Sequence, residues 1–283
     1  MKCRNGRGAV LAIAIAAALT GLAACTSSES SDKPEGERRT RSASHAALRL
    51  AERSTDRAES ARIRSTTVMG TELSLKADGV LGWGKGLTGT LTITYTGGTT
   101  AETMRGLGIT SMEARYLSDA YYAHMGDTFA KKAGGKHWIK YAYDDLADLG
   151  GGATFGDQMR NTTPNQSVRL LLDSEDVREV GEEKVDGRAT THYSGTVDVG
   201  EVADARLRKQ LQEAGVTTET VDIWVDDQDL LVKKVEKGRT ATGELTQTAY
   251  YSDYGVRVSV REPPAGDTED FRILMERQGG SAS

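Results

Sequence analysis

Cysteine is nearly absent from this sequence, which contains only Cys3 and Cys25 among its 283 residues. If an N-terminal leader is removed through residue 24, Cys3 leaves with it, and the mature chain can form neither an internal disulfide nor a metal site built on several cysteines. Phenylalanine occurs only three times, so a core must consist mainly of Leu, Val, Ile, Ala and Tyr. The 36 basic residues are outnumbered by 41 acidic ones and form no long run. Because affinity for nucleic acid comes mainly from neutralising phosphates, we expect no nucleic-acid partner.

The residue patterns of common enzymes are missing as well. The sequence contains four histidines, His45, His124, His137 and His192. No two of them have the i, i+4 spacing of a helical metal site, and no G-x-S-x-G nucleophile motif is present. Residues 84–89 match G-x-G-x-x-G, but a strand follows them where a phosphate loop needs a helix, which favours a hairpin or bulge. The acidic turn 226–229 lacks the glycine and distal glutamate of an EF-hand. We therefore expect no enzyme, no metal and no cofactor.

The N-terminus carries the clearest signal that is present. A basic start precedes an apolar run over residues 9–19, and Leu22-Ala23-Ala24-Cys25 closes the segment. This order is typical of a secretory signal peptide over residues 1–24, and the run is about half the ~20 residues needed to cross a bilayer. Leu-Ala-Ala-Cys resembles a bacterial lipobox, which implies that Cys25 becomes the acylated first residue (for example with palmitate), anchoring the chain to the cell membrane outside the cytoplasm. An ordinary signal peptide with an incidental cysteine is the alternative.

The residues that follow Cys25 form a polar segment. Residues 26–40 contain no apolar side chain that could start a core, so 25–40 is predicted to be a lipidated cysteine and a disordered tether. After cleavage, 33 Lys and Arg remain against 41 Asp and Glu, a net charge of −8. The folded domain is predicted over 41–265, and 266–283 is predicted to be a C-terminal tail.

The first folded element is predicted to be a helix over residues 42–62. Small and apolar residues recur there at steps of three and four, the period of one helical face. That predicted inner face consists of Ala43, Ala47, Leu50, Ser54, Ala58 and Ala61.

From residue 63 onward the period changes to two, which is typical of strands with one buried face. The apolar members of the early runs are Leu73, Leu75 and Ala77, then Leu91, Ile93 and Tyr95, then Met112, Ala114 and Tyr116, and then His137, Ile139 and Tyr141. The later runs include Tyr193, Val197 and Val199, then Val221, Ile223 and Val225. Further strands are predicted over 230–236, 244–251 and 255–260.

Helical segments interrupt these strands. Short helical turns are predicted over 144–149 and 168–172 on either side of three glycines, and a longer helix over 203–214 with Gly215 as its C-terminal cap. A terminal helix over 267–277 is compatible with the composition of the tail. The sequence leaves open whether that tail covers the domain or hangs free.

The order of elements and several strand motifs resemble a known family. The matching segments are Gly135-Lys136-His137-Trp138-Ile139-Lys140, Val185 to Tyr193, Val197-Asp198-Val199, Val221 to Asp226 and Leu230 to Lys234. They are similar to the lipoproteins LppX and LprG, relatives of the carrier LolA, over roughly residues 43–265. The resemblance implies an α+β fold, a half-open antiparallel β-barrel with a long N-terminal helix and helical lids, that holds the acyl chains of a lipid or glycolipid. It carries no catalytic residues.

The strand pattern adds a candidate lining for such a cavity. The inward positions are Leu73, Leu75, Leu91, Ile93, Tyr193, Val197, Val221, Ile223 and Val225. A period-two apolar face also suits a solid core. The expected partners are therefore the membrane, through acylated Cys25, and a lipid or lipoglycan ligand. The alternative is an envelope interaction or signalling module of the same fold, which binds a protein partner and no lipid.

Overall fold

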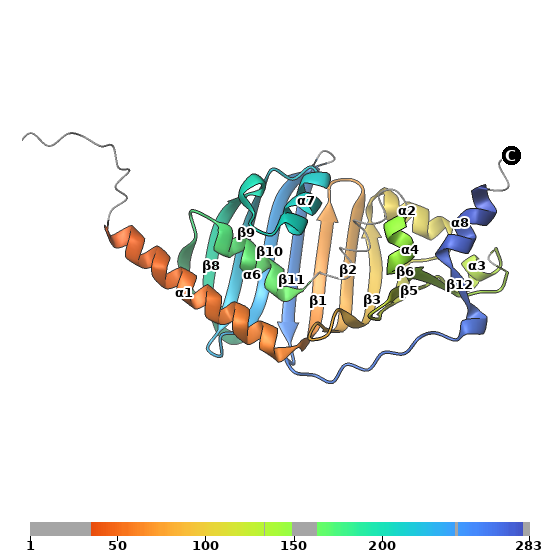
Figure 1. Ribbon diagram of the computed structural model, residues 1–283, viewed down its shortest axis with the longest axis horizontal. Coiled ribbons are helices and arrows are strands. Elements are labelled where there is room, and N and C mark those ends of the chain that lie inside the picture. The colour runs from red at the N-terminus through yellow and green to blue at the C-terminus, as the bar shows by residue number, and fades with distance from the viewer. Residues whose placement is uncertain (1–34, 133, 149–162, 241–242, 280–283) are drawn as a thin grey trace, which may run out of the picture. The chain divides into compact units, whose positions relative to one another are not determined.

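A single twelve-stranded sheet forms the frame of the molecule (Figure 1). The computed structural model describes residues 35–132, 134–148, 163–240 and 243–279, and residues 35–283 belong to one compact unit. The predicted signal peptide and Cys25 lie outside the described residues. The strands are β1 (Ser60–Met69), β2 (Leu73–Gly82), β3 (Thr88–Gly97), β4 (Ser111–Tyr116), β5 (Ala120–His124), β6 (Trp138–Ala142), β7 (Arg178–Val185), β8 (Arg188–Asp198), β9 (Thr218–Asp226), β10 (Leu231–Thr240), β11 (Gly243–Ser252) and β12 (Thr268–Asp270).

The strand order is β12-β6-β5-β4-β3-β2-β1-β11-β10-β9-β8-β7. Strands that follow one another along the chain mostly pair directly, as expected when short turns join antiparallel strands. In the middle of the sheet β1 pairs with β11, with Ile63 opposite Tyr251. Among the described strands, only β12 runs parallel to its neighbour, β6. Within the described residues β7 and β12 remain separate edges, so the sheet curls without closing. The expected half-open antiparallel barrel of an α+β protein is confirmed.

Helices flank the sheet. They are α1 (Glu35–Ala58), α2 (Gly98–Gly106), α3 (Gly126–Ala130), α4 (Tyr143–Asp148), α6 (Pro164–Asp173), α7 (Ala205–Glu213) and α8 (Phe271–Gly279). Among the described residues, no helix combines the length and the apolar composition that a membrane crossing requires.

Helices α4, α6 and α7 confirm the three predicted helical segments. At the start of α7 the Asp204 carboxylate accepts hydrogen bonds from the backbone N–H groups of Arg206 and Leu207. At its end Gly215 adopts a φ of 75°, the left-handed conformation that favours glycine after a helix. The predicted glycine break at 150–152 lies outside the described residues.

The prediction for the first helix was wrong in its bounds and in its face. Helix α1 begins at Glu35, inside the predicted tether, and ends at Ala58, after which Ala61 belongs to β1. Its buried residues are Ser44, Leu48, Ala51 and Thr55. The predicted face has the same spacing but is offset by one residue along the chain, so it lies beside the buried face. Its Leu50 is 43% exposed. Two faces of this helix have helical periodicity, and only packing against the sheet selects between them.

The C-terminal segment also departs from the prediction. Residues 255–260 form no strand but belong to an extended connector that runs along the lower edge of the sheet in Figure 1. The Ser60 hydroxyl donates to the Val256 carbonyl, and Arg115 donates to the Arg261 carbonyl. The connector therefore passes the ends of β1 and β4 on its way to the far edge of the sheet.

At that far edge, residues of the predicted tail belong to the domain. Strand β12 pairs with β6, placing Thr268 opposite Trp138, and Phe271 at the start of α8 lies 4.7 Å from the Tyr141 ring. The predicted boundary at 265 therefore does not separate a tail from the sheet. Residues 255–260 alternate like a strand, but this pattern does not show whether a partner strand is available. The segment that does pair with β6 is β12, which comes later in the chain.

Candidate functional site

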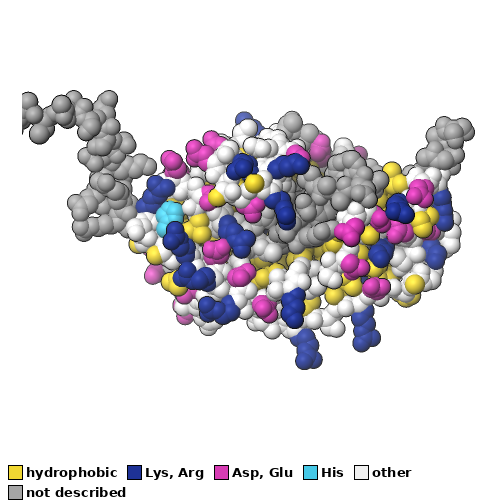
Figure 2. Space-filling model, viewed as in Figure 1, with side chains coloured by type: hydrophobic (Ala, Val, Ile, Leu, Met, Phe, Trp, Pro, Cys, Tyr) yellow, Lys and Arg dark blue, Asp and Glu magenta, His cyan; other side chains and the backbone are white. Residues whose placement is uncertain are grey.

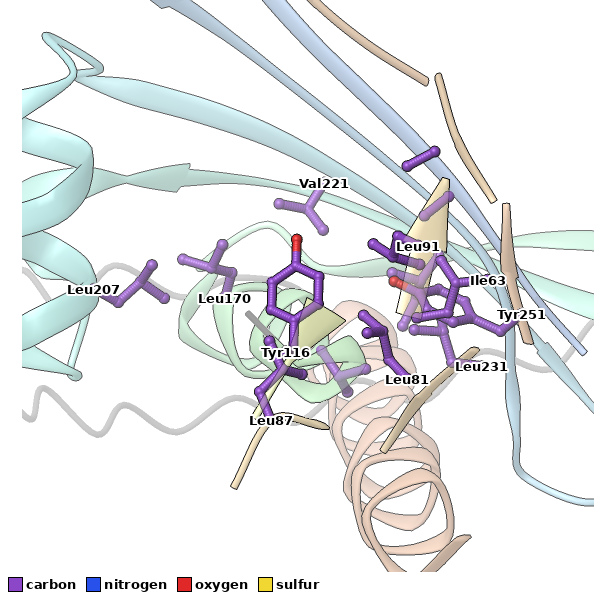
Figure 3. Close-up of a cluster of buried hydrophobic side chains, with 14 of the residues drawn as sticks. Ile63, Leu81, Leu87, Leu91, Tyr116, Leu170, Leu207, Val221, Leu231 and Tyr251 are labelled. Atoms are coloured by element: carbon purple, nitrogen blue, oxygen red, sulfur yellow. The ribbon is translucent and has the colours of Figure 1, made fainter. Parts of the chain in front are cut away.

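The inner face of the sheet is the face that packs against α1, α6 and α7. Figure 3 shows side chains of this face and its covering helices pointing into one interior around the ring of Tyr116. Ile63 comes from β1 and Val221 from β9, whereas Leu170 and Leu207 come from α6 and α7. The interior is therefore lined from both halves of the open sheet and from its helical covers.

Most of the predicted lining residues lie in this interior. Six belong to its buried core and Ile93 packs against them at its margin. The six buried ones are Leu91, Tyr193, Val197, Val221, Ile223 and Val225. Leu73 and Leu75 are half-buried near the start of β2, outside the buried cluster formed by the described residues. The structure thus brings seven of the nine positions together.

Helix α6 is the more firmly held of the two covers. Its Val168 and Leu171 are fully buried, and Arg169 forms a 2.8 Å ion pair with Glu52 of α1. It approaches β8 where that strand has Gly195: a Cβ there would lie 2.9 Å from Leu171 Cδ1. The missing side chain of Gly195 therefore permits the close packing of α6 on the sheet.

Helix α7 is held by fewer contacts. Leu207 is its only buried residue among the described ones, and Leu211 is partly buried against the core. The segment before it is tied to α6 because the Ala203 N–H donates to the Asp173 carboxylate at 2.9 Å. Since burial of apolar area is what attaches such a helix, α7 is the less firmly attached of the two covers.

Tyrosines line the other half of the inner face, under α4 and α8. The Tyr116 and Tyr121 ring centroids are 5.2 Å apart, and those of Tyr121 and Tyr141 are 5.7 Å apart. Burial raises the pKa of Tyr141 to about 12 and raises the pKa of Tyr116 and of Tyr121 as well. These hydroxyls therefore stay protonated at physiological pH.

Sequence reasoning missed the strand that carries Tyr121. In β5 the residues from Ala120 to Ala123 are all buried, so the period-two signal is lost. Its outward-facing residues, Ala120 and Tyr122, are buried because they form a second apolar cluster with Trp138. The β-prone Tyr-Tyr pair was the remaining signal.

Three charged-type side chains of β9 and β10 are also buried on the inner face, and the sequence analysis did not single them out. Glu219 is 3% exposed, and Lys234 and Glu236 are 5% and 8% exposed. Glu219 lies two residues before Val221 in β9, and Glu236 is directly opposite Val221 in β10, so both carboxyls share the side of the apolar lining.

The charges of this trio are unevenly paired. Lys234 Nζ lies 2.8 Å from Glu236 Oε2, whereas Glu219 Oε2 is buried without a hydrogen-bond partner in the described part of the chain. Burial and the nearby Glu236 charge raise the pKa of Glu219 to about 8, against the opposing effect of Lys234. Glu219 is therefore mostly protonated at neutral pH.

The four histidines lie in three places, of which the first is His45 on α1. The rings of His124 and His137 stack at 6.2 Å, and His137 Nδ1 lies 2.6 Å from the Asp267 carboxylate just before β12. His192 lies in β8, on the outer face, stacked on Trp224. The structure thus brings two of the histidines together and shows His137 holding the C-terminal segment.

The two loop motifs have structural roles in the described residues. Strand β3 starts at Thr88, inside the 84–89 glycine motif, in agreement with the predicted hairpin. In the acidic turn, one Asp226 carboxylate oxygen accepts hydrogen bonds from the backbone N–H groups of Gln228 and Leu230, which stabilises the turn.

Comparison with known proteins agrees with this architecture. The chain is 59% identical to a Streptomyces coelicolor protein named "Putative lipoprotein SCO4650" over 97% of this chain and 98% of that one. It is 49% identical to an uncharacterized 31.2 kDa protein of Streptomyces griseus, covering 83% of this chain and 81% of the relative. No protein-family model matches.

Two solved structures share the fold at low sequence identity. Lipoprotein LppX of Mycobacterium tuberculosis superposes with a TM-score of 0.51 at 16% identity, covering 78% of this chain and 99% of LppX. LprF of Mycobacterium bovis gives 0.50 at 14% identity, covering 79% and 98%. The chain therefore belongs to the same protein family as the Streptomyces coelicolor relative and shares the fold of LppX and LprF.

Proposed function

We propose that this chain is a lipoprotein anchored through acylated Cys25 on the outer side of the cytoplasmic membrane, where it binds or carries the acyl part of a lipid or glycolipid. The observation that carries the proposal is the inner face, because an open sheet lined by aliphatic and tyrosine side chains from β1 to β11 is covered by separate helices. The lipobox-like sequence and the lipoprotein name of the close relative support the anchor.

The driving force for such a ligand is apolar burial. Each CH₂ group transferred from water contributes about 0.8 kcal/mol. The burial of one long acyl chain therefore offsets the loss of several side-chain contacts between a covering helix and the sheet. The lining residues are already buried by the helices, and an acyl chain therefore enters only when a cover moves. We assign that movement to α7, whose attachment depends mainly on Leu207.

The proposal is tested with the mature chain from residue 25 carrying Cys25→Ser, so that no covalent acyl chain is present. Native mass spectrometry and organic extraction should find a co-purifying lipid in stoichiometric amount. The delipidated protein should also take up a fluorescent fatty-acyl probe. A chain that neither carries lipid nor takes up the probe would refute the proposal.

Variants on the two faces of the sheet separate ligand binding from stability. Ile223→Trp and Leu91→Trp place a large ring on the inner face and should abolish probe uptake while the protein still folds. Val68→Trp is the matched control, because Val68 is an exposed residue of β1. Uptake that survives both inner-face variants would contradict a ligand in this interior.

An interaction module without a lipid ligand is the second candidate. The observation that favours it is the burial of the inner face with protein side chains alone. In that case both inner-face tryptophans overpack a solid core, and each should lower stability by about 1–3 kcal/mol. The melting temperatures of the same variants therefore distinguish the two functions. We propose no enzymatic activity for either candidate.

A further inference from the structure

Helix α1 carries a row of basic residues at intervals of four. The row consists of Arg41, His45, Arg49, Arg53 and Arg57. Residues four apart are neighbours on a helix surface, so these side chains form a stripe that turns by about 40° around the helix at each step. Arg49, Arg53 and Arg57 therefore share one side of α1. Figure 2 shows dark blue Lys and Arg side chains gathered on the side of the molecule where Figure 1 places α1. The stripe is unusual because the mature chain has a net charge of −8.

The C-terminal part of the stripe faces solvent. Arg49, Arg53 and Arg57 are exposed and lie across the helix from the buried residues Leu48 and Thr55. In the described part of the chain, no ion pair joins any of these three arginines to an acidic residue. Two acidic side chains of α1 have partners in α6: Glu52 pairs with Arg169, and Asp56 accepts a hydrogen bond from Asn165.

The N-terminal end of the stripe lies against the domain, since Arg41 Nη2 donates a hydrogen bond to the Ser174 carbonyl at 3.3 Å. His45 follows between Arg41 and Arg49. Burial and the positive charges of both arginines lower the pKa of His45, which reflects the positive field there. Leu50, with its 43% exposure, adds an apolar contact beside the stripe.

We propose that the exposed part of the α1 stripe, Arg49 to Arg57, is a docking surface for the anionic headgroups of a phospholipid membrane. The pattern of arginines beside an exposed leucine suits the headgroup boundary, where arginine binds phosphate and an apolar side chain contacts acyl carbons. This proposal rests on the proposed function, because the anchor at Cys25 is what holds α1 near the membrane. Cys25 lies only ten residues before Glu35, the first residue of α1. That segment spans at most ~35 Å, so an anchored chain brings α1 to the membrane surface.

The docking surface would give the carrier a defined orientation. A lipid anchor and a polar tether alone allow the domain to rotate freely, whereas a stripe along one helix fixes the helix parallel to the surface. Each arginine near an anionic surface strengthens binding by about fivefold. Removal of three should therefore weaken binding roughly 100-fold.

The test uses the mature chain with Cys25→Ser and vesicles in a sedimentation assay. One set of vesicles contains phosphatidylglycerol and phosphatidylcholine, and the other contains phosphatidylcholine only. We expect binding to the anionic vesicles alone, and this binding should weaken as salt screens the charges. Arg49→Gln with Arg53→Gln and Arg57→Gln should abolish it, whereas lysine at all three positions should retain most of it.

A charge-matched control changes Lys85, Lys131 and Lys132 to Gln, because all three are exposed and lie outside α1. That variant should bind anionic vesicles as strongly as the protein with no change in its lysines or arginines. Equal binding to both kinds of vesicle, or full binding by the arginine-to-glutamine variant, would overturn the proposal. The same variant should still take up the acyl probe, so failure of membrane docking and failure of lipid carriage give different results.

Discussion

The substitution Glu219→Gln probes the polar group buried in the apolar interior. Glutamine has nearly the same shape as glutamate but cannot ionise. The variant therefore loses the ionisable group and keeps nearly all of its packing contacts. In the folded protein, burial and Glu236 raise the pKa of Glu219 to about 8, compared with an ordinary value of 4.5. Between these two values the folded state retains a proton that the unfolded state releases.

The sign of the effect follows from this difference. The raised pKa contributes stability that is fully present below pH 4.5 and is lost as pH rises toward 8. The total loss is at most ~5 kcal/mol, at about 1.4 kcal/mol per pH unit. Between pH 5 and pH 7 the wild type should lose ~2–3 kcal/mol from this group alone.

Thermal unfolding measured at pH 5 and pH 7 checks this value. The difference in free energy of unfolding between Glu219→Gln and wild type should change by ~2–3 kcal/mol in favour of the variant. For a domain of this size, that is a relative shift of ~5–10 °C in melting temperature. Glu182→Gln, at an exposed position of β7, controls for loss of a negative charge. A pH-independent difference would refute the reasoning and show that Glu219 is ionised in the fold.

Three further outcomes are expected. Gly195→Ala should lower stability by about 1–3 kcal/mol in thermal unfolding, because its Cβ would lie 2.5 Å from Ser174 Oγ; Gly266→Ala, with no neighbour within 4 Å, should not. NMR titration should place the His137 pKa above 6.5, because its ring is hydrogen-bonded to Asp267. The stability that this pair contributes is lost as pH rises through that raised pKa. Asp267→Asn should lower the midpoint of the His137 titration. Leu207→Ala should speed acyl-probe entry in stopped-flow fluorescence by loosening α7, and an unchanged entry rate would exclude α7 as the lid.

Local patterns predicted those parts of the fold that depend on near neighbours in the chain. The alternation at Leu91 and Ile93, and again at Val221 and Ile223, identified strands because a half-buried strand exposes every second residue. Helix α7 was predicted because its start, its apolar stripe and Gly215 all lie within a few residues of one another.

Features that depend on distant contacts were missed or wrong. The inner face of α1 was misassigned because Leu50 and Leu48 offer equally periodic faces, and contact with the sheet selects Leu48. Strand β5 was missed because a second apolar cluster buries its outer face. The tail from residue 266 joins the sheet because β12 finds its partner in β6, far away in the sequence.

The sequence by itself therefore determined most of the strands, the resemblance to LppX and the absence of a recognisable catalytic motif, since each of these is written in short runs of residues. Only the tertiary structure decided which face of α1 carries arginines into solvent and which carboxyl, Glu219, is enclosed among apolar side chains. The physical reason is that burial and charge environment are properties of surfaces brought together from β9, β10 and the helices, and no single segment contains them.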